Sequence, residues 1–295
     1  SARAFAPLRA STTIARVRRM RVVTSAMSKG ELVLVTGATG RVGKEVVARL
    51  ASMPGFRVRA ATRDKAEYAN SLGAHETVTF DLEDKSTWEP ALRGATRLFS
   101  STQDKYIERH MEFAKFCGET PEIRDSLKHV VRVSCFGADT NTNCYDKSVH
   151  VSRPNAEIPL MLQHYWWSEE CFIDAGFKDK LTSIRGNFYM NHLLKNELDR
   201  IKTKGSFTSP LGDTKNSFVA CNDMAEAAVR CLVEGPERHG DKYYDICGAQ
   251  SLSMAEVAEI LTKALATDEA KNVCPEAHGK RITYEPQDIE QFEQD

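Results

Sequence analysis

The chain has 295 residues, of which 41% are hydrophobic and 27% charged, a composition typical of a folded globular protein with room for one large α/β core. No run approaches the roughly 20 uninterrupted apolar residues of a membrane-spanning helix, so we expect no transmembrane segment. Residues 1–30 hold seven of the 40 basic residues and none of the 41 acidic ones, which leaves the rest of the chain with a net charge of −8. Because an acidic body repels phosphate backbones, nucleic acid is not an expected partner.

Residues 1–29 are rich in Arg, Ala, Ser and Thr and contain neither an acid nor an unbroken apolar core. This composition resembles a transit peptide that directs import into an organelle. The many hydroxyl side chains favour a chloroplast, with delivery to the plastid stroma, over a mitochondrion. The alternative is a flexible basic arm that contacts a partner subunit in an organelle complex.

Apolar runs and helical periodicities alternate along the rest of the chain. The strands are expected at 32–35, 56–61, 76–80, 97–100, 129–133, 181–184, 242–246 and 281–284. The helices are expected at 42–53, 64–72, 85–93, 104–117, 160–175, 189–203, 223–233 and 254–265. The polar stretch 137–159 is expected to be a loop over the mouth of the active site, and short polar β segments are expected in 205–220.

Strands that alternate with helices predict an α/β fold with a doubly wound parallel sheet. We expect residues 30–295 to form one domain. Its substrate side, a small carboxyl-terminal α/β region, is expected to come from about 187–220 and 240–295.

A glycine-rich turn lies between the first strand and the first helix. Gly37, Gly40 and Gly43 are spaced three residues apart, in the strand–turn–helix context of a dinucleotide-binding fingerprint. The first glycine allows a tight turn, the second lets backbone amides approach a pyrophosphate, and the third lets the helix pack close to the sheet. The turn therefore predicts a Rossmann fold that binds NAD(P), with Thr39, Arg41 and Val42 also at the cofactor. A purely structural glycine turn is the alternative.

Further segments from residue 31 to 285 resemble those of atypical short-chain dehydrogenases, and in particular the NmrA-like family. The matching segments are Thr36-Gly37-Ala38-Thr39-Gly40-Arg41-Val42-Gly43, Asp81-Leu82, Val133-Ser134-Cys135-Phe136-Gly137-Ala138, Ser168-Glu169-Glu170 and Leu181 to Asn191. Gly186 stands where the family usually has proline. The resemblance implies that Asp81 and Leu82 contact the adenine. The NmrA-like family includes both NADP-linked quinone or isoflavone-type reductases and cofactor-sensing regulators.

The end of the second strand indicates which cofactor is used. NAD enzymes usually carry an acid there to bind the ribose 2′-hydroxyl, whereas this chain has Arg63, with Arg41 inside the glycine turn. Guanidinium groups suit a 2′-phosphate, which they can grip through paired hydrogen bonds. We therefore expect NADP rather than NAD; the alternative is that both arginines are solvated surface charges.

Catalytic residues are harder to assign. Short-chain dehydrogenases usually protonate their substrate with a Tyr that has a Lys four residues later, and none of the eight tyrosines has one. Residues after the carboxyl ends of the strands are expected to line the site. They are Ser100, Ser101, Thr102, Ser134, Asn187 and Phe188 at the cofactor, with Ser134, His164 and Tyr165 as candidates for the chemistry. No zinc-type Cys/His spacing is present, so no metal is expected.

Two functions remain open at this stage. The first is an NADPH-dependent reductase that transfers hydride to a quinone or another small conjugated carbonyl. The second is a non-catalytic NADP(H)-binding protein: a redox sensor, an assembly factor or an accessory subunit of a photosynthetic or respiratory complex. The missing Tyr/Lys pair favours the second.

Overall fold

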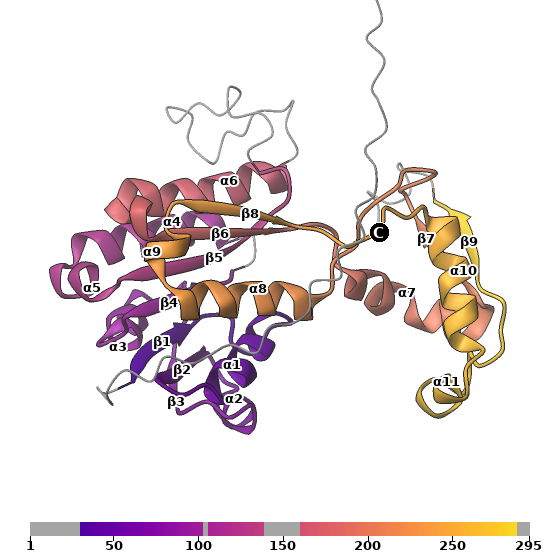
Figure 1. Ribbon diagram of the computed structural model, residues 1–295, viewed down its shortest axis with the longest axis horizontal. Coiled ribbons are helices and arrows are strands. Elements are labelled where there is room, and N and C mark those ends of the chain that lie inside the picture. The colour runs from indigo at the N-terminus through magenta and orange to yellow at the C-terminus, as the bar shows by residue number, and fades with distance from the viewer. Residues whose placement is uncertain (1–29, 103–105, 139–159, 288–295) are drawn as a thin grey trace, which may run out of the picture.

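The computed structural model describes residues 30–102, 106–138 and 160–287. The expected transit peptide of residues 1–29, and residues 139–159 of the expected loop over the site, lie outside these ranges. The described residues form two lobes of unequal size (Figure 1). Within them, no helix has both the length and the apolar character needed to cross a membrane.

The larger lobe is built on a seven-stranded sheet with the order β3-β2-β1-β4-β5-β6-β8, in which every neighbouring pair is parallel. Its strands are β1 (Glu31–Val35), β2 (Phe56–Thr62), β3 (Glu76–Thr79), β4 (Arg97–Ser100), β5 (His129–Cys135), β6 (Leu181–Gly186) and β8 (Lys242–Ile246). The order runs outward in both directions from β1 and β4, so the predicted doubly wound parallel sheet is confirmed.

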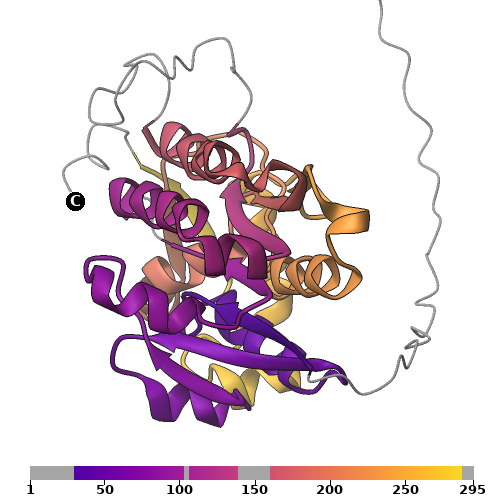
Figure 2. The ribbon, with the colours of Figure 1, turned by 90° about the vertical axis from the view of Figure 1, so that its left-hand side faces the viewer.

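Helices cover both faces of this sheet (Figure 2). One face carries α1 (Gly43–Ala51), α2 (Ala66–Ser71) and α8 (Cys221–Glu234), and the other carries α3 (Trp88–Leu92), α4 (Ile107–Glu119) and α6 (Leu160–Phe172). Val33 and Val35 pack in the first core and Leu34 in the second, all of them fully buried. A strand buried on both faces must be apolar throughout, which is why the run 32–35 could be identified as a central strand.

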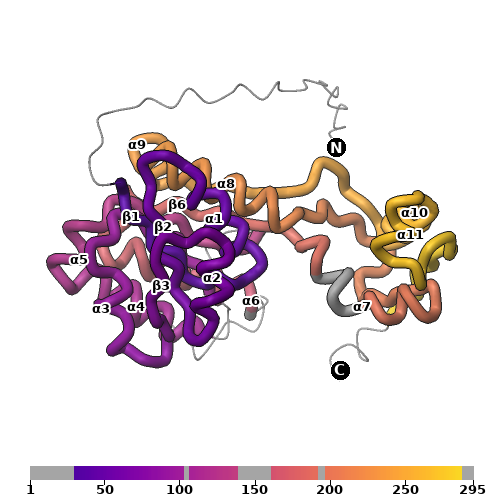
Figure 3. The backbone as a smooth tube through the Cα atoms, turned by 90° about the horizontal axis from the view of Figure 1, so that it is seen from below, coloured from indigo at the N-terminus to yellow at the C-terminus, as the bar shows by residue number. Residues whose placement is uncertain are grey.

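The smaller lobe lies beyond the carboxyl ends of the strands (Figures 1 and 3). It consists of α7 (Met190–Lys204), β7 (Ser206–Ser209), α10 (Met254–Leu265), α11 (Asp268–Val273) and β9 (Thr283–Pro286). β7 and β9 pair in parallel, and a separate core that includes Phe207, Met254 and Ile282 holds the lobe together. Ser253 begins α10 with a capping box to Glu256. The chain enters this lobe after β6 and again after β8, so it adjoins the edge of the sheet where ligands bind in such folds.

The observed helices differ from the predicted ones in length. The predicted helix 85–93 is a 3-10 turn (Lys85–Thr87) followed by the short α3, and 160–175 is α6 followed by a π-helical turn (Ile173–Phe177). Three short helices were not predicted: α5 (Pro121–Ser126), α9 (Pro236–His239) and α11. Helices of four to six residues contain too few turns for an apolar period to show in the sequence.

A buried hydrogen-bond network lies at the amino-terminal end of the sheet, opposite the glycine turn. His129 Nε2 donates to Thr182 Oγ1 over 2.8 Å, because the threonine hydroxyl itself donates to the carbonyl oxygen of His239 over 2.6 Å. His239 in turn contacts Glu234 and Tyr244 through its two ring nitrogens. Burial, the charge of Arg97 and the nearby His239 lower the pKa of His129 to about 3.

We predict that this histidine makes the fold sensitive to acid. The pKa of His129 in the folded state lies below the value of about 6.5 in an unfolded chain, so protonation favours the unfolded state. The free energy of unfolding is therefore highest above pH 6.5 and falls as the pH drops toward 3. At pH 5 the loss is about 2 kcal/mol. Urea unfolding of His129→Gln should show a weaker decline between pH 7 and 5 than wild type, with His278→Gln as control. Equal declines in wild type and His129→Gln would contradict the assignment.

Candidate functional site

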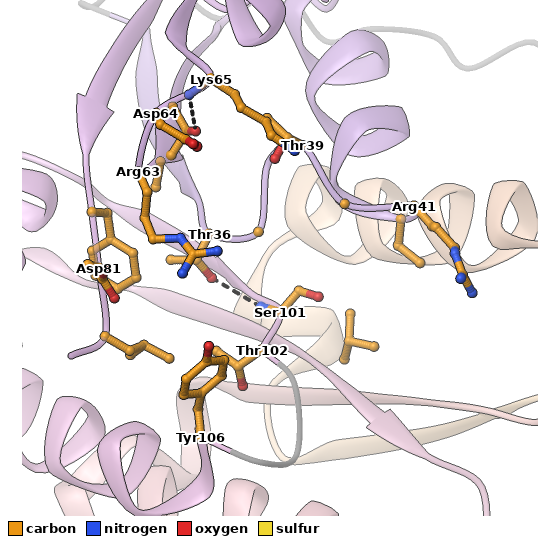
Figure 4. A pocket seen from close by; sticks show the side chains of 18 of the residues that line it. Thr36, Thr39, Arg41, Arg63, Asp64, Lys65, Asp81, Ser101, Thr102 and Tyr106 are labelled. Atoms are coloured by element: carbon orange, nitrogen blue, oxygen red, sulfur yellow. Dashed lines mark hydrogen bonds between the residues drawn. The ribbon is translucent and has the colours of Figure 1, made fainter. Parts of the chain in front are cut away.

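A cleft of about 740 Å³ opens where the first five strands of the sheet end, between α1 and the amino-terminal part of α6 (Figure 4). Eleven of the residues predicted for the site line it: Gly37, Thr39, Gly40, Arg41, Val42, Arg63, Asp81, Leu82, Ser101, Thr102 and Tyr165. They come from five separate segments of the chain. The parallel sheet brings the segments together because the carboxyl ends of its strands share one edge.

The glycine turn forms one wall of the cleft and is held in place by close backbone contacts. Gly37 has φ +61°, and a Cβ atom there would lie 2.8 Å from the carbonyl oxygen of Ser101. A Cβ atom on Gly43 would lie only 2.1 Å from the carbonyl oxygen of Gly37. Thr36 Oγ1 donates to the Phe99 carbonyl and accepts from the Ser101 amide, which ties the turn to the end of β4.

These contacts place the start of α1 at the cleft. Gly40, Arg41 and Val42 line the cleft directly before the first residue of the helix, Gly43. The amides of the first helical turn have no partners within the helix, and the helix dipole adds a partial positive charge there. This wall can therefore bind an anion such as a pyrophosphate.

The opposite wall, at the end of β2, carries two bases, Arg63 and Lys65, with Asp64 between them. Arg63 points into the cleft, and Lys65 lies two residues further along the same segment, while the Arg41 side chain extends away from Arg63 (Figure 4). The Lys65 amide donates to Thr62 Oγ1 over 3.0 Å, which fixes the backbone of this loop. Arg63 and Lys65 have no ion-pair partner among the described residues. Arg63 and Lys65 thus lie on one side of the cleft, and Arg41 lies on the side of the glycine turn.

Asp81 and Leu82 follow β3 on the same side as Arg63. The Asp81 carbonyl accepts hydrogen bonds from Trp88 Nε1 and Thr87 Oγ1, and its carboxylate accepts one from the Glu83 amide. These bonds hold the loop against α3 with Leu82 nearly buried. The segment could flank a flat ring such as an adenine.

Phenol and thiol groups gather at the other end of the cleft. Tyr165 from α6 and Tyr189 from the segment before α7 both line it, together with Tyr106, Val133 and Cys221. Burial raises the pKa of the Tyr189 phenol, so this side chain is a neutral hydroxyl at physiological pH. Burial likewise raises the pKa of Cys221, which keeps its thiol protonated. Three tyrosines therefore line the cleft, and one of them, Tyr189, offers a neutral hydroxyl.

Six predicted site residues do not line the cleft: Gly43, Ser100, Ser134, His164, Asn187 and Phe188. The side chains of Ser100 and Ser134 point into the protein, where their hydroxyls have no hydrogen-bond partner among the described residues. Phe188 is 47% exposed on the side of the smaller lobe, and the Phe188 amide donates to Asn187 Oδ1. Of the three candidates for the chemistry, only Tyr165 reaches the cleft.

Sequence reasoning missed ten lining residues, among them Lys65, Tyr106, Val133, Tyr189 and Cys221. Lys65 could have been predicted, because it is a second basic residue only two positions after Arg63. Tyr189 directly follows Asn187 and Phe188 in a segment already assigned to the site, so it could have been included. Nothing in the sequence pattern placed Tyr106 or Cys221, whose positions depend on how α4 and α8 pack.

A doubly wound parallel sheet with a glycine turn at this edge defines the Rossmann class of dinucleotide-binding folds. Within that class, the chain belongs to the NmrA-like family, whose sequence profile matches residues 29–294. The family predicted from the sequence is confirmed.

Similar proteins include both enzymes and a chloroplast protein. An NAD(P)H azoreductase of Xenophilus azovorans is 31% identical over 235 residues, which cover 79% of this chain and 73% of that protein. The chloroplastic protein TIC 62 of Arabidopsis thaliana is 25% identical over 289 residues, 89% of this chain and 42% of that protein. The structure of an NADPH-dependent quinone oxidoreductase of Escherichia coli with NADPH superposes with a TM-score of 0.65 at 22% identity, covering 88% and 80% of the two chains.

We predict that substitution by alanine destabilises the protein at one glycine of the turn and is tolerated at another. Gly43→Ala should lower the free energy of unfolding by about 3 kcal/mol, because its Cβ atom would overlap the backbone of Gly37. Gly40→Ala should change it by less than about 1 kcal/mol, since its Cβ atom meets only the Gly37 carbonyl oxygen at 3.1 Å and otherwise faces the cleft. Denaturant unfolding of both variants measures this difference. Equal costs would show that the close approach at Gly43 does not constrain the turn.

Proposed function

We propose that this protein is an NADPH-dependent reductase that passes hydride to a quinone or another small conjugated acceptor. The observation that carries the proposal is the pairing of a glycine turn at a helix amino terminus with the Arg63 and Lys65 side chains across one cleft. A dinucleotide with a 2′-phosphate needs both features. The names of the azoreductase and the quinone oxidoreductase support the choice of acceptor.

The cleft residues suggest how NADPH is held. The amides of Arg41 and Val42 would bind the pyrophosphate, with the dipole of α1 favouring its negative charge, while the Gly40 amide donates to the Gly37 carbonyl oxygen within the turn. Arg63 and Lys65 would bind the 2′-phosphate through charge-assisted hydrogen bonds. On this arrangement Asp81 and Leu82 flank the adenine, while Ser101 and Thr102 lie along the nicotinamide half.

When bound, NADPH supplies a hydride to the acceptor. The chain itself must then supply a proton to the acceptor oxygen, and Tyr165 is the candidate because its side chain lines the cleft. Tyr189, kept neutral by burial, would donate a second hydrogen bond that orients the acceptor. His164 and Ser134 lie outside the cleft, so we assign them no direct part.

Turnover tests this function. We expect the purified protein to oxidise NADPH, followed at 340 nm, when members of a panel of benzoquinones and naphthoquinones are added. Tyr165→Phe should lower kcat by about 10²-fold or more, the usual contribution of a positioned acid, while leaving the affinity for NADPH unchanged. Tyr68→Phe, an exposed tyrosine outside the cleft, is the matched control. If no acceptor in the panel is reduced although NADPH binds, the reductase proposal fails.

A second candidate function is NADP(H) binding without turnover. The specific observation in its favour is that no tyrosine has a lysine four residues later, so the usual means of activating the phenol is missing. Under this alternative, calorimetry would show one NADPH bound per chain and no quinone would oxidise it. The same purified protein therefore distinguishes the two functions.

Cofactor preference gives a prediction that holds for both functions. NADP(H) should bind at least tenfold more tightly than NAD(H), because Arg63 and Lys65 occupy the position where NAD enzymes carry an acid. Arg63→Asp should abolish or reverse the preference, since a carboxylate would then face the 2′-phosphate. Calorimetric titration of each cofactor measures this. Arg57→Asp, an exposed change near the start of the same strand, should leave the ratio as in wild type; equal affinities in wild type would refute the assignment.

Location in a chloroplast is a further part of the proposal. It is supported by the acid-free, hydroxyl-rich composition of residues 1–29 and by the similarity to a chloroplastic protein. A fusion of residues 1–30 to a fluorescent reporter should enter plastids, and a fusion with its six arginines changed to glutamine should stay in the cytosol. Delivery of the unaltered fusion to mitochondria, or its retention in the cytosol, would contradict the plastid assignment.

A further inference from the structure

An arginine lies buried within the sheet beside the cleft. Arg132, in the middle of β5, is 2% exposed. Its Nε donates to Ser168 Oγ over 3.2 Å and its Nη1 donates to the Ser100 carbonyl over 3.1 Å. No carboxylate among the described residues comes within 4.0 Å of this guanidinium. Burying a charge without an ion-pair partner is costly, so a structural role alone explains Arg132 poorly.

None of the ionisable groups around Arg132 in the described part of the chain forms an ion pair with it. Glu169 on α6 is committed to Arg185, which it binds through both carboxylate oxygens at 2.9 and 2.7 Å. His110 on α4 is neutral, because burial and the charge of Arg132 hold its pKa well below the usual range. Burial also raises the pKa of the Cys171 thiol to about 12. This buried layer between β5, α4 and α6 therefore keeps a net positive charge.

The bonds of Arg132 connect it to the cleft at two points. Its acceptor Ser100 is followed directly by Ser101, which lines the cleft. Its other partner, Ser168, donates its own hydroxyl to the carbonyl oxygen of Tyr165 over 2.7 Å, one turn earlier on α6. Arg132 thus links the end of β4 to the helical turn that carries the candidate proton donor.

The Tyr165 phenol is also near enough to Arg132 for their charges to interact. Burial lowers the pKa of Arg132, and the Tyr165 side chain is the first of the groups that raise it again. Tyr189 is the other phenol nearby, but burial opposes its ionisation more strongly than Arg132 favours it. Among the groups that favour the charged form of Arg132, Tyr165 comes before Tyr189, so Tyr165 is the phenol that interacts more strongly with this buried cation.

We propose that Arg132 is the positioning residue for Tyr165 and supplies the positive charge that a lysine supplies in other short-chain dehydrogenases. The inference rests on the proposed reductase function. As hydride reaches the acceptor from NADPH, the O–H bond of Tyr165 breaks and a new O–H bond forms on the acceptor oxygen. The phenolate left behind is stabilised by the Arg132 guanidinium until a water molecule returns the proton.

Ionisation of Tyr165 can be followed without turnover. Protein labelled with ¹³C at the tyrosine Cζ is titrated by NMR, and the Tyr165 signal is assigned by its loss in Tyr165→Phe. In the wild type we expect this phenol to ionise below the value of about 10 for free tyrosine. Arg132→Met should shift its ionisation upward by at least about one pH unit, and Arg132→Lys should keep most of the wild-type behaviour.

Arg97→Met is the matched control. Arg97 is likewise buried, but it lies at the amino-terminal end of β4, where it pairs with Glu31. Its loss should leave the Tyr165 titration unchanged. The pH profile of kcat should shift in Arg132→Met in the same direction as the Tyr165 titration. The value of kcat should fall by about tenfold or more, while the affinity for NADPH stays as in wild type.

The outcomes separate this inference from the function on which it rests. If NADPH is oxidised and Tyr165 titrates alike in wild type and Arg132→Met, the role of Arg132 is refuted and the reductase stands. If no acceptor is reduced but Tyr165 responds to Arg132 as expected, the function fails while the coupling holds. Should Arg132→Met not fold, ionisation of Tyr165 at or above pH 10 in the folded wild type overturns the inference.

Discussion

The near contact between the backbones of Gly37 and Gly43 determines the shape of the cleft. A side chain at Gly43 would overlap the Gly37 carbonyl, so only glycine lets the start of α1 lie this close to the end of β1. The same turn is anchored to β4 by Thr36, whose hydroxyl binds the Phe99 carbonyl and the Ser101 amide. Because of these contacts, a helix amino terminus and two strand ends face the same space.

The two ends of the cleft differ in the groups that they offer to a ligand. One end combines the helix amino terminus with Arg63 and Lys65, all of which attract phosphate oxygens. The other end holds Tyr165 and Tyr189, the second of which is kept neutral by burial, with the buried cation Arg132 behind them. A dinucleotide that bears its phosphates at one end and its reactive ring at the other matches this distribution, and a free nucleotide would leave the tyrosine end unused.

The sequence was informative where physical constraints act locally. The apolar runs of β1 and β5 identify strands buried on both faces, and the spacing of Gly37, Gly40 and Gly43 identifies the turn. Residues whose role depends on tertiary packing could not be placed. Arg132 lies within an apolar strand, and the sequence cannot show that its side chain turns toward α6, away from Val133 in the cleft. The meeting of Tyr165 and Tyr189 likewise depends on how α6 packs beside the end of β6.

The most direct test of the cleft as an NADPH site is a crystal structure of the protein with NADP⁺. We expect the pyrophosphate at the amides of Arg41 and Val42, the 2′-phosphate between Arg63 and Lys65, and the nicotinamide ring beside Tyr165. A dinucleotide bound with its nicotinamide away from Tyr165, or with its 2′-phosphate free of both basic side chains, would contradict the assignment of the site.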